Sequence, residues 1–583
     1  MDAIKIAPEL LLAFQAYKSE GQVDFSVHSI RTLSIEGRAG SPESPKVNVF
    51  LHCDEAAELD HLEEKGVQVN TWKGRIRTAS LSLENLEHLY EDPDIIYVGA
   101  SHKLHPLMDV ASARVQLPEF RNETGLTGEG VIIGVVDTGI DSNHPAFQER
   151  VLRILDQELQ QELTGENLSC SRDTDGHGTH VAGIAAGNDD QYGGIAPEAE
   201  LVIVKSTLDE ADTSDGIRYI FRIAEELGRP AVVNLSLGGH YDPHDGSDDL
   251  SKSIDELSGP GRIVCCSAGN EGNYNIHAQA HLAKNGDSRS IRFFVPQTSG
   301  NDAIRNVTLK GWYSGRDPIE VAIQSPSGTW TDYQGILSEN ALVSHHLPDA
   351  HIYTVTPEND STNQDHSFTV TVNSVGSDRG VTPGIWKLWL RGRDISNIQV
   401  DMWVLDGKNP PQVVFIGRSV SDSMKIGSPG AARRAITVAS YTTQNEWSDI
   451  DGRNWSTGLA LNDISDFSSE GPLRNGGQKP DVAAPGAYIA SCMSDDVDQQ
   501  PRWRQINSHY TMMAGTSMSA PFISGIIALL LQYDPTFAPE RIRTILQKSS
   551  SIHGNRPGRF HPKWGYGLID ADALADTLAS FTS

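Results

Sequence analysis

The sequence predicts an α/β protein with a doubly wound, mostly parallel β-sheet and helices on both of its faces. Four nearly uninterrupted apolar runs have the composition of strands that are buried on both sides. They cover residues 131–136, 201–204, 231–235 and 263–266. Helical patterns lie between these runs, around residues 180–186 and 215–227. Because strands that alternate with helices form such sheets, we expect the functional site at the carboxyl ends of the strands.

A small α+β unit is expected before this sheet, over residues 1–108. An amphipathic segment at residues 8–18 predicts a helix, and the following pattern predicts strand, helix, strand, strand, helix, strand. These six elements cover residues 46–52, 54–65, the two halves of 67–82, 83–91 and 95–98. Asp54 is expected to cap the first of these two helices and Gly66 to end it. This order of elements predicts a ferredoxin-like fold.

The helical patterns stop between residues 275 and 420. Seven short alternating segments, separated by Gly, Pro, Asn and Asp, predict an inserted antiparallel β-sandwich of jelly-roll type. They cover residues 291–295, 307–312, 319–323, 352–355, 368–372, 385–390 and 398–404. The α/β pattern resumes with a strand at 435–439 and helices after Ser517 and over 539–547. The α/β domain is therefore expected in two parts, residues 109–274 and 421–583.

The charge of the chain narrows the classes of partner. Of 583 residues, 77 are acidic and 47 are basic, which gives a formal net charge of −30 at pH 7. Such a charge disfavours nucleic acid or an anionic membrane as the main partner. The sequence contains no run of 18 apolar residues, so no membrane span is predicted. The oligomeric state stays open.

The cysteines indicate the compartment. The chain has 5 of them, an odd number at irregular spacing, and two are adjacent in an apolar run. This pattern predicts free thiols in a reducing environment. The apolar patch at residues 10–14 is too short for a signal peptide and lacks a basic leader. We therefore expect a cytoplasmic protein, with non-classical export left open.

Three polar stretches lie where buried elements end or begin. Asp137 follows the first buried strand, His177 precedes a helical pattern, and Ser517 precedes a long apolar run. Attack on an acyl carbon needs a serine, a base of near-neutral pKa and a carboxylate that orients the base. The order Asp, His, Ser is one of three chain orders of such triads. Asn270 follows another buried strand and can donate a hydrogen bond to a developing oxyanion.

Each of these residues also has an ordinary structural interpretation. Ser517 could be the N-cap of a core helix, and Asn234 and Asn270 could satisfy backbone groups at strand ends. His180 is interpreted as a packed helix residue, and Asp141 as a turn carboxylate. Four polar residues in the right order favour catalysis over these alternatives.

The polar motifs resemble those of the subtilisin-like serine proteases, the subtilases. The resemblance covers residues 125–272 and 421–575. The motifs that carry it are D-T-G at 137–139, H-G-T-H-V-A-G at 177–183, V-N-L-S-L-G-G at 233–239, S-A-G-N-E-G at 267–272 and G-T-S-M-S-A-P at 515–521.

The resemblance implies a serine endopeptidase that hydrolyses peptide bonds of proteins through an acyl-enzyme. Asp137 would orient the imidazole, His177 would act as general base and then as acid, and Ser517 would be the nucleophile. Asn270 and the backbone N–H of Ser517 would stabilise the oxyanion. The edge on which a protein or peptide substrate pairs as an added strand would be formed by Ser236, Leu237 and Gly238.

The resemblance also implies a role for the N-terminal unit. Residues 1–108 resemble the subtilase propeptide, which assists folding and then inhibits the enzyme. Residues 101–108 would lead into the active-site cleft, so we expect a zymogen that cleaves itself in this tail. The alternative is a catalytically silent or propeptide-inhibited scaffold or sensor with the subtilase fold. The presence of all three triad residues favours the enzyme.

Two departures from the subtilase pattern bear on cofactors and specificity. Many subtilases bind calcium through an Asp at the position that Ala146 occupies here, so no metal or cofactor is predicted. Other Asp-rich loops leave a calcium site open. The inserted sandwich resembles insertions in the clostridial germination proteases of the Csp group. The acidic stretch at residues 208–215 predicts a preference for basic side chains N-terminal to the cut.

Overall fold

The computed structural model forms two compact units. The first comprises Met1–Lys103, Ser247–Asp249 and Tyr274–Asp422, and the second comprises Leu104–Gly246, Leu250–Asn273 and Ser423–Ser583. The structure describes residues 5–20, 35–36, 45–70, 73–101, 105–106, 117–189, 192–298, 303–313, 318–336, 342–357, 359–360, 362–376, 380–405, 413–552 and 558–582.

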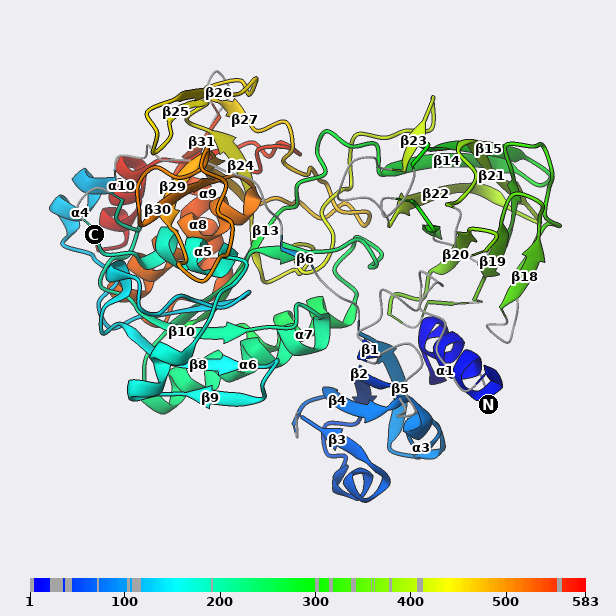
Figure 1. The fold of residues 1–583 in the computed structure, drawn as a ribbon, viewed down its shortest axis with the longest axis horizontal. Helices are drawn as coiled ribbons and strands as arrows, with labels where there is room; N and C mark the ends of the chain where they lie inside the picture. Colours follow the sequence, from blue (N-terminus) through cyan, green and yellow to red (C-terminus); the bar gives the residue numbers. More distant parts are fainter. Residues whose placement is uncertain are drawn as a thin grey trace. The chain divides into compact units, whose positions relative to one another are not determined.

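The core of the second unit is an 11-stranded sheet (Figure 1). Its strands follow the order β31-β32-β28-β24-β13-β11-β7-β10-β8-β9, and β27 pairs with β24. The strands from β32 to β8 pair in parallel, whereas β31, β27 and β9 are antiparallel to their neighbours. Their bounds are β7 Ile132–Asp137, β8 Val151–Asp156, β9 Gln161–Leu163, β10 Glu200–Lys205, β11 Ala231–Leu235, β13 Arg262–Ser267, β24 Ile436–Thr442, β27 Asp463–Ile464, β28 Val482–Ala487, β31 Ser550–Ser551 and β32 Leu568–Ile569. The predicted parallel sheet is thus confirmed, with antiparallel strands added to it.

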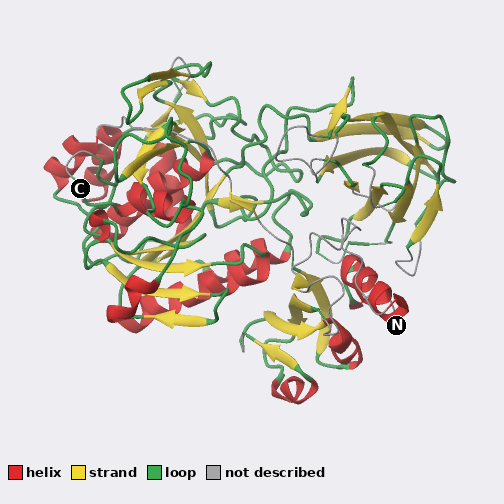
Figure 2. Cartoon of the chain, in the orientation of Figure 1, coloured by secondary structure: helices red, strands yellow, loops and turns green. Residues whose placement is uncertain are grey.

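The helices of this part of the chain are among those drawn in red in Figure 2. One of them, α8, is almost wholly buried. They are α4 Leu117–Thr124, η4 Pro145–Phe147, η5 Gly165–Cys170, α5 His177–Ala186, α6 Glu210–Leu227, α7 Asp249–Leu257, α8 Thr516–Tyr533, α9 Pro539–Lys548 and α10 Ala571–Thr582. Among the described helices, only α8 is long and apolar enough to cross a membrane. Because 89% of its apolar window is buried inside the protein, α8 has the surroundings of a core helix.

Helices cover both faces of the sheet. Successive side chains along β7 point to opposite faces. Ile133 and Val135 join the hydrophobic core that α5 and α8 line. Gly134 instead faces α6, and a Cβ there would lie 2.5 Å from Cγ2 of Ile220. The glycine therefore allows α6 to pack closely on this face.

Three small antiparallel sheets complete the second unit. They pair β6 with β12, β25 with β26, and β29 with β30. Their bounds are β6 His105–Pro106, β12 Leu237–Gly238, β25 Glu446–Ser448, β26 Asn454–Ser456, β29 Ile489–Cys492 and β30 Tyr510–Met513.

The N-terminal part of the first unit is a five-stranded antiparallel sheet with its own core. Strand β2 pairs with β1, β4 and β5, and β3 pairs with β4. The elements are α1 Pro8–Glu20, β1 Ile35–Glu36, β2 Lys46–Cys53, η2 Asp60–Lys65, β3 Val67–Val69, β4 Ile76–Ser82, η3 Leu83–Asn85, α3 Leu86–Glu91 and β5 Ile95–Ala100.

The prediction of a helix that starts at Asp54 was wrong about both the first residue and the type of the helix. Only a short 3₁₀ helix, Asp60–Lys65, forms there, although Gly66 ends it in the left-handed conformation with φ 74°. The buried guanidinium of Arg77 donates to the carbonyl oxygens of Asp54 (3.4 Å) and Glu55 (3.1 Å). These two carbonyls therefore have a partner that competes with the hydrogen bonds of a first helical turn.

The inserted segment of the first unit forms two antiparallel sheets around a shared core. The sheet orders are β14-β22-β16-β20-β19-β18 and β17-β21-β15-β23. The strands are β14 His277–Lys284, β15 Ser288–Val295, β16 Asn306–Tyr313, β17 Ile319–Gln324, β18 Val343–His346, β19 His351–Val355, β20 His366–Asn373, β21 Gly384–Gly392, β22 Ser396–Val404 and β23 Val414–Ile416. The sequence predicts seven of these strands and misses β14, β18 and β23.

Candidate active site

The structure brings Asp137 and His177 into direct contact. Asp137 is the last residue of β7, and His177 is the first residue of α5. His177 Nδ1 lies 2.7 Å from Asp137 Oδ1, and the two side chains are 0% and 1% exposed. Burial opposes the imidazolium, but Asp137, together with the nearby carboxylates of Asp175 and Asp173, outweighs burial and raises the pKa of His177 above its ordinary value. The pair is therefore built to accept a proton on the imidazole.

The second ring nitrogen of His177, Nε2, is available to accept a proton. His177 Nε2 is buried and has no hydrogen-bond partner among the described residues. Because Nδ1 donates to Asp137, the neutral ring carries its proton on Nδ1 and a lone pair on Nε2. This tautomer is the one that a general base requires.

Ser517 lies in the first turn of α8 and touches the segment that follows β11. Its Oγ donates to the carbonyl oxygen of Ser236 at 3.3 Å, and Ser236 Oγ donates to the carbonyl oxygen of Ser517 at 2.8 Å. Asn234 steadies this contact, since its Nδ2 donates to Ser236 Oγ at 2.9 Å and its Oδ1 accepts from Ser524 at 2.9 Å. Asn234 thus has the structural role that its strand-end position allows.

The pairing register places these groups at one edge of the sheet. β7 and β11 pair in parallel with Val135 opposite Asn234, so Asp137 and Ser236 stand at the same level. The packing of α5 against α8 leads to the same placement of their first residues. Ala185 lies eight residues after His177, Gly525 lies eight residues after Ser517, and a Cβ at Gly525 would lie 3.1 Å from the carbonyl oxygen of Ala185. The first turns of α5 and α8 therefore both lie at the carboxyl edge.

Asn270 is fixed beside the first turn of α8. Its Oδ1 accepts from the backbone N–H of Thr516 at 2.9 Å and from Thr516 Oγ at 3.1 Å. Thr516 Oγ in turn accepts from the N–H of Gly269 at 3.1 Å. Because the amide oxygen is used in this way, the amide nitrogen of Asn270 remains as a donor next to Ser517.

The segment predicted to bind substrate already pairs with another strand of this chain. β12 lies antiparallel to β6, with Leu237 opposite Pro106 and Gly238 opposite His105. Ser236 and Leu237 are fully buried and Gly238 is partly exposed. Of the tail predicted at residues 101–108, only 101, 105 and 106 are among the described residues. The edge of this segment is therefore paired with a two-residue extended strand of the same chain.

A pocket opens beside Asn270. It is lined by Gly238, Gly239, His240, Ser267, Ala268, Gly269, Glu271, Gly427 and Ser428. Two of the glycines are required by close approaches. A Cβ at Gly427 would lie 2.2 Å from the carbonyl oxygen of Gly239, and a Cβ at Gly269, where φ is +109°, would lie 2.7 Å from Ser469 Oγ.

Comparison with known proteins decides the family. Residues 128–302 and 331–568 match the family model described as the subtilase family. This chain belongs to the subtilase family. The predicted resemblance is thereby confirmed, and with it the class of subtilisin-like serine protease.

The similarity to individual proteins of known sequence and structure supports the same family. Serine protease AprX of Bacillus subtilis is 23% identical over 503 residues, which cover 83% of this subtilase and 75% of AprX. An alkaline protease of Alkalihalobacillus alcalophilus is 32% identical over 239 residues, covering 40% of this chain and 58% of its own. The CspB protease of Clostridium perfringens superposes with a TM-score of 0.67 at 25% identity, covering 79% of this chain and 97% of CspB.

Asp173 is a buried residue of this subtilase site that the sequence interpretation missed. Its carboxylate accepts from Thr138 Oγ at 2.8 Å, Gly176 N at 2.9 Å, Thr179 N at 2.8 Å and Thr179 Oγ at 2.6 Å. These bonds join the end of β7 to the start of α5. The signal in the sequence was an Asp four residues before His177, within a polar run that offers several alternatives.

His180 lies in the core of the subtilase domain. It is fully buried, and its Nε2 faces the carbonyl oxygens of Ile489 (3.1 Å) and Thr511 (3.2 Å). Burial lowers the pKa of His180 to about 3, so the ring is neutral at physiological pH. Asp141 accepts from the N–H groups of Asn143 and Asp495, each at 3.1 Å, as a loop carboxylate does.

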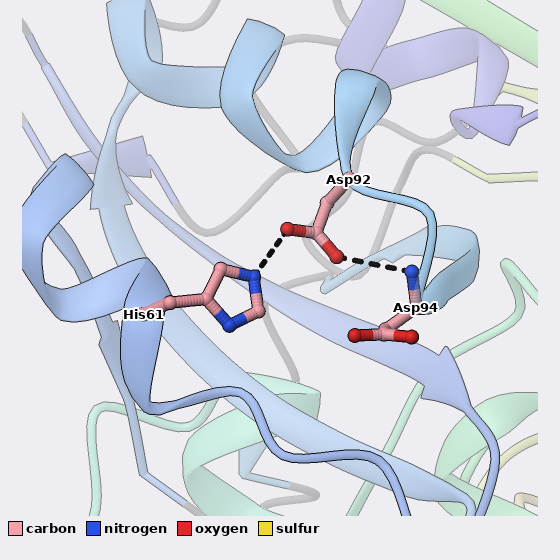
Figure 3. A group of neighbouring side chains, drawn as sticks. All are labelled: His61, Asp92 and Asp94. Atoms are coloured by element: carbon pink, nitrogen blue, oxygen red, sulfur yellow. Dashed lines mark hydrogen bonds and ion pairs between the residues drawn. The ribbon is translucent and has the colours of Figure 1, made fainter.

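Ala146, which stands where a calcium-binding Asp was considered in the sequence, is a buried residue of η4. In the described part of the chain, one group of three side chains has metal-ligand spacing: His61, Asp92 and Asp94 (Figure 3). Asp92 accepts from His61 Nε2 and from the N–H of Asp94, and Lys65 Nζ lies 3.8 Å away. These neighbours satisfy Asp92 without an ion, so we assign no metal to this group. All five cysteines are free.

Proposed function

We propose that this subtilase is an endopeptidase that cleaves proteins through Asp137, His177 and Ser517. The observation that carries the proposal is the buried contact of His177 Nδ1 with Asp137 at 2.7 Å, at the sheet edge where α8 begins. A carboxylate in this position orients the imidazole and stabilises the imidazolium that forms when the base takes a proton. Ser517 Oγ would lose its proton to His177 Nε2 as it attacks the scissile carbonyl.

Two hydrogen-bond donors would stabilise the oxyanion. They are the side-chain amide of Asn270 and the backbone N–H of Ser517, which lies in the first turn of α8. The first N–H groups of a helix lack partners within the helix and carry partial positive charge. His177 would then return the proton to the leaving amine, and a water molecule would hydrolyse the acyl-enzyme by the reverse path.

A bound substrate would extend along Ser236, Leu237 and Gly238. The antiparallel pairing of β6 with β12 supports this, since a peptide of this chain already uses the edge. The acidic stretch expected to select basic residues forms the start of α6, where Asp209 caps the helix by accepting from Asp212 N at 2.7 Å. Its effect on specificity stays a proposal.

We further propose that residues 1–108 are a propeptide of ferredoxin-like fold and that the enzyme is made as a zymogen. The supporting observations are the antiparallel sheet of the N-terminal part and the strand β6 on the substrate edge. Self-cleavage would fall in the segment that carries β6. The same pairing also favours the second candidate, a subtilase that its own propeptide keeps silent.

The test compares the wild type with Ser517→Ala. Intact-mass analysis of freshly purified protein should show a shortened wild-type chain and a full-length Ser517→Ala chain. Only the wild type should hydrolyse casein. If both chains keep the same mass, the zymogen proposal fails, and if neither hydrolyses casein after prolonged incubation, the silent scaffold is favoured.

A further inference from the structure

The pocket beside Asn270 carries two titratable side chains on an otherwise backbone-rich wall. Its lining includes four glycines, together with His240 and Glu271. The two side chains are 12% and 11% exposed. On the proposed function, this pocket takes the substrate side chain immediately before the scissile bond (P1). The charge of these groups therefore bears on which substrates fit.

One ion pair and one hydrogen bond join Glu271 to a second histidine, and a further hydrogen bond joins that histidine to a backbone carbonyl. His240 Nε2 lies 3.3 Å from Glu271 Oε2, and His240 Nδ1 lies 2.9 Å from His244 Nε2. His244 Nδ1 lies 2.9 Å from the carbonyl oxygen of Asp242. The two rings are parallel within 5° with centroids 5.2 Å apart, a geometry that allows an in-plane hydrogen bond between them.

The three contacts need more hydrogens than two neutral histidines carry. Each of the three contacts needs one hydrogen, and the carbonyl of Asp242 can only accept, so His244 Nδ1 donates. Two neutral imidazoles supply two hydrogens, one fewer than the contacts need. A third proton must therefore reside on the histidines or on Glu271.

We propose that His240, His244 and Glu271 share this one proton and that it switches the pocket between two classes of P1 side chain. With the proton bound, the three groups are neutral together and the pocket takes an uncharged side chain. With the proton lost, they carry one negative charge, and the pocket takes Lys or Arg. This inference rests on the proposed function of the site.

Neighbouring groups determine where the proton resides. Glu271 Oε2 also accepts from Asn270 N at 2.8 Å and from Ser469 Oγ at 3.0 Å. Hydrogen bonds of this kind favour the ionised carboxylate, so the shared proton is held on the histidines. Asp242 adds to this preference, because its Oδ1 lies 3.8 Å from His244 Nδ1.

The other charged groups nearby are already paired. Arg474 bonds Asp245 at 2.6 Å and donates to the carbonyl oxygen of Pro243 at 2.8 Å. Lys425 donates to the carbonyl oxygen of Gly272 at 2.8 Å and lies 3.2 Å from Glu470.

The experiment measures kcat/KM for two peptides that differ only at P1, one with Lys and one with norleucine, from pH 5.5 to pH 9. Titration of the catalytic histidine affects both peptides alike and cancels in their ratio. We expect the Lys/norleucine ratio to rise about tenfold or more with pH along a single-proton curve. A ratio that does not change with pH in an active enzyme overturns the shared proton and leaves the proposed function intact.

Three variants sharpen the result. His240→Gln should flatten the dependence of the ratio on pH, and Glu271→Gln should hold the ratio low at every pH. His281→Gln is the matched control, since His281 is an exposed histidine of β14 in the other unit. It should keep the wild-type curve. Loss of the pH dependence in the control, or its persistence in His240→Gln, would overturn the assignment, and hydrolysis of neither peptide would overturn the proposed function as well.

Discussion

Thr138 donates a hydrogen bond to Asp173 over 2.8 Å, and this contact links the strand of the candidate carboxylate to the helix of the candidate base. Thr138 Oγ also accepts from the N–H of Gly178 at 2.9 Å. The contact of Asp137 with His177 thus depends on a second, buried carboxylate. Asp173 is 0% exposed and acts as a positioning residue.

Asp173→Asn should therefore weaken both the fold and the activity. The amide replaces one acceptor oxygen with a donor, which opposes the N–H groups that the carboxylate now binds. We expect the free energy of unfolding to fall by about 1–3 kcal/mol. We also expect kcat to fall while KM changes little. Urea denaturation and steady-state kinetics measure the two effects.

The control for this variant is Asp576→Asn, which changes an exposed carboxylate of α10. It should alter the free energy of unfolding by less than about 0.5 kcal/mol. Equal effects of the two substitutions would show that Asp173 has no positioning role.

Asn270→Ala should lower kcat without much change in KM. The substitution removes the amide that the bonds to Thr516 hold next to Ser517, and an oxyanion donor acts mainly in the transition state. The expected loss is about 10²–10³-fold, the magnitude that removal of one such donor has in a subtilisin. A loss confined to KM would contradict the oxyanion role.

Asp212→Asn should stabilise the protein at high pH. Burial and the neighbouring Asp209 raise the pKa of Asp212 to about 8. Because the folded state holds this proton more tightly than the unfolded state, its contribution to stability is complete below about pH 4 and is lost as the pH rises through about 8. Thr207 Oγ lies within hydrogen-bond distance of both carboxylates, and the side-chain oxygen of an Asn at residue 212 can still accept from it.

The measurement is the free energy of unfolding of both proteins at pH 5, 7 and 9. The advantage of Asp212→Asn over the wild type should grow from pH 5 to pH 9. Asp572→Asn, an exposed carboxylate of α10, should show no such trend. A difference that stays constant with pH would refute the raised pKa.

Gly427→Ala should distort the pocket. Its Cβ would lie 2.2 Å from the backbone oxygen of Gly239, so the backbone on one side must move. We expect a lower melting temperature and a selective loss of kcat/KM for peptides with large P1 side chains. Gly458→Ala is the control, because a Cβ there meets nothing within 4 Å. The pocket assignment is wrong if large and small P1 side chains suffer equally.

The parts of the fold that follow periodicity could be predicted from the sequence. Strands such as β7 and β11 are continuous apolar runs, and their burial on both faces leaves few alternatives. Strand β14 was missed because its inward residues, Ala278, Ala280 and Leu282, are mostly small and weak strand formers. The helix expected from Asp54 does not form for a different reason, since the carbonyl oxygens of Asp54 and Glu55 accept from Arg77 of strand β4.

In the candidate site too, some residues could be predicted from the sequence and others could not. Asp137, His177, Asn270 and Ser517 stand in short motifs whose order identifies the family, and the family is shown by the comparison. Contacts that join distant segments could not be predicted. Asp173 is one of several acidic residues in its run, and the link from Glu271 to His244 joins two loops that no periodic pattern relates.

The most direct test of the account is covalent labelling of the nucleophile. A fluorophosphonate probe reacts with a serine only where a base and an oxyanion site activate it. Intact-mass and peptide-mapping analysis should find one label per chain, on Ser517, with the label lost in Ser517→Ala and strongly slowed in His177→Ala. Labelling of another residue, or an unlabelled wild type after prolonged incubation, would contradict the assignment of Asp137, His177 and Ser517 as a working triad.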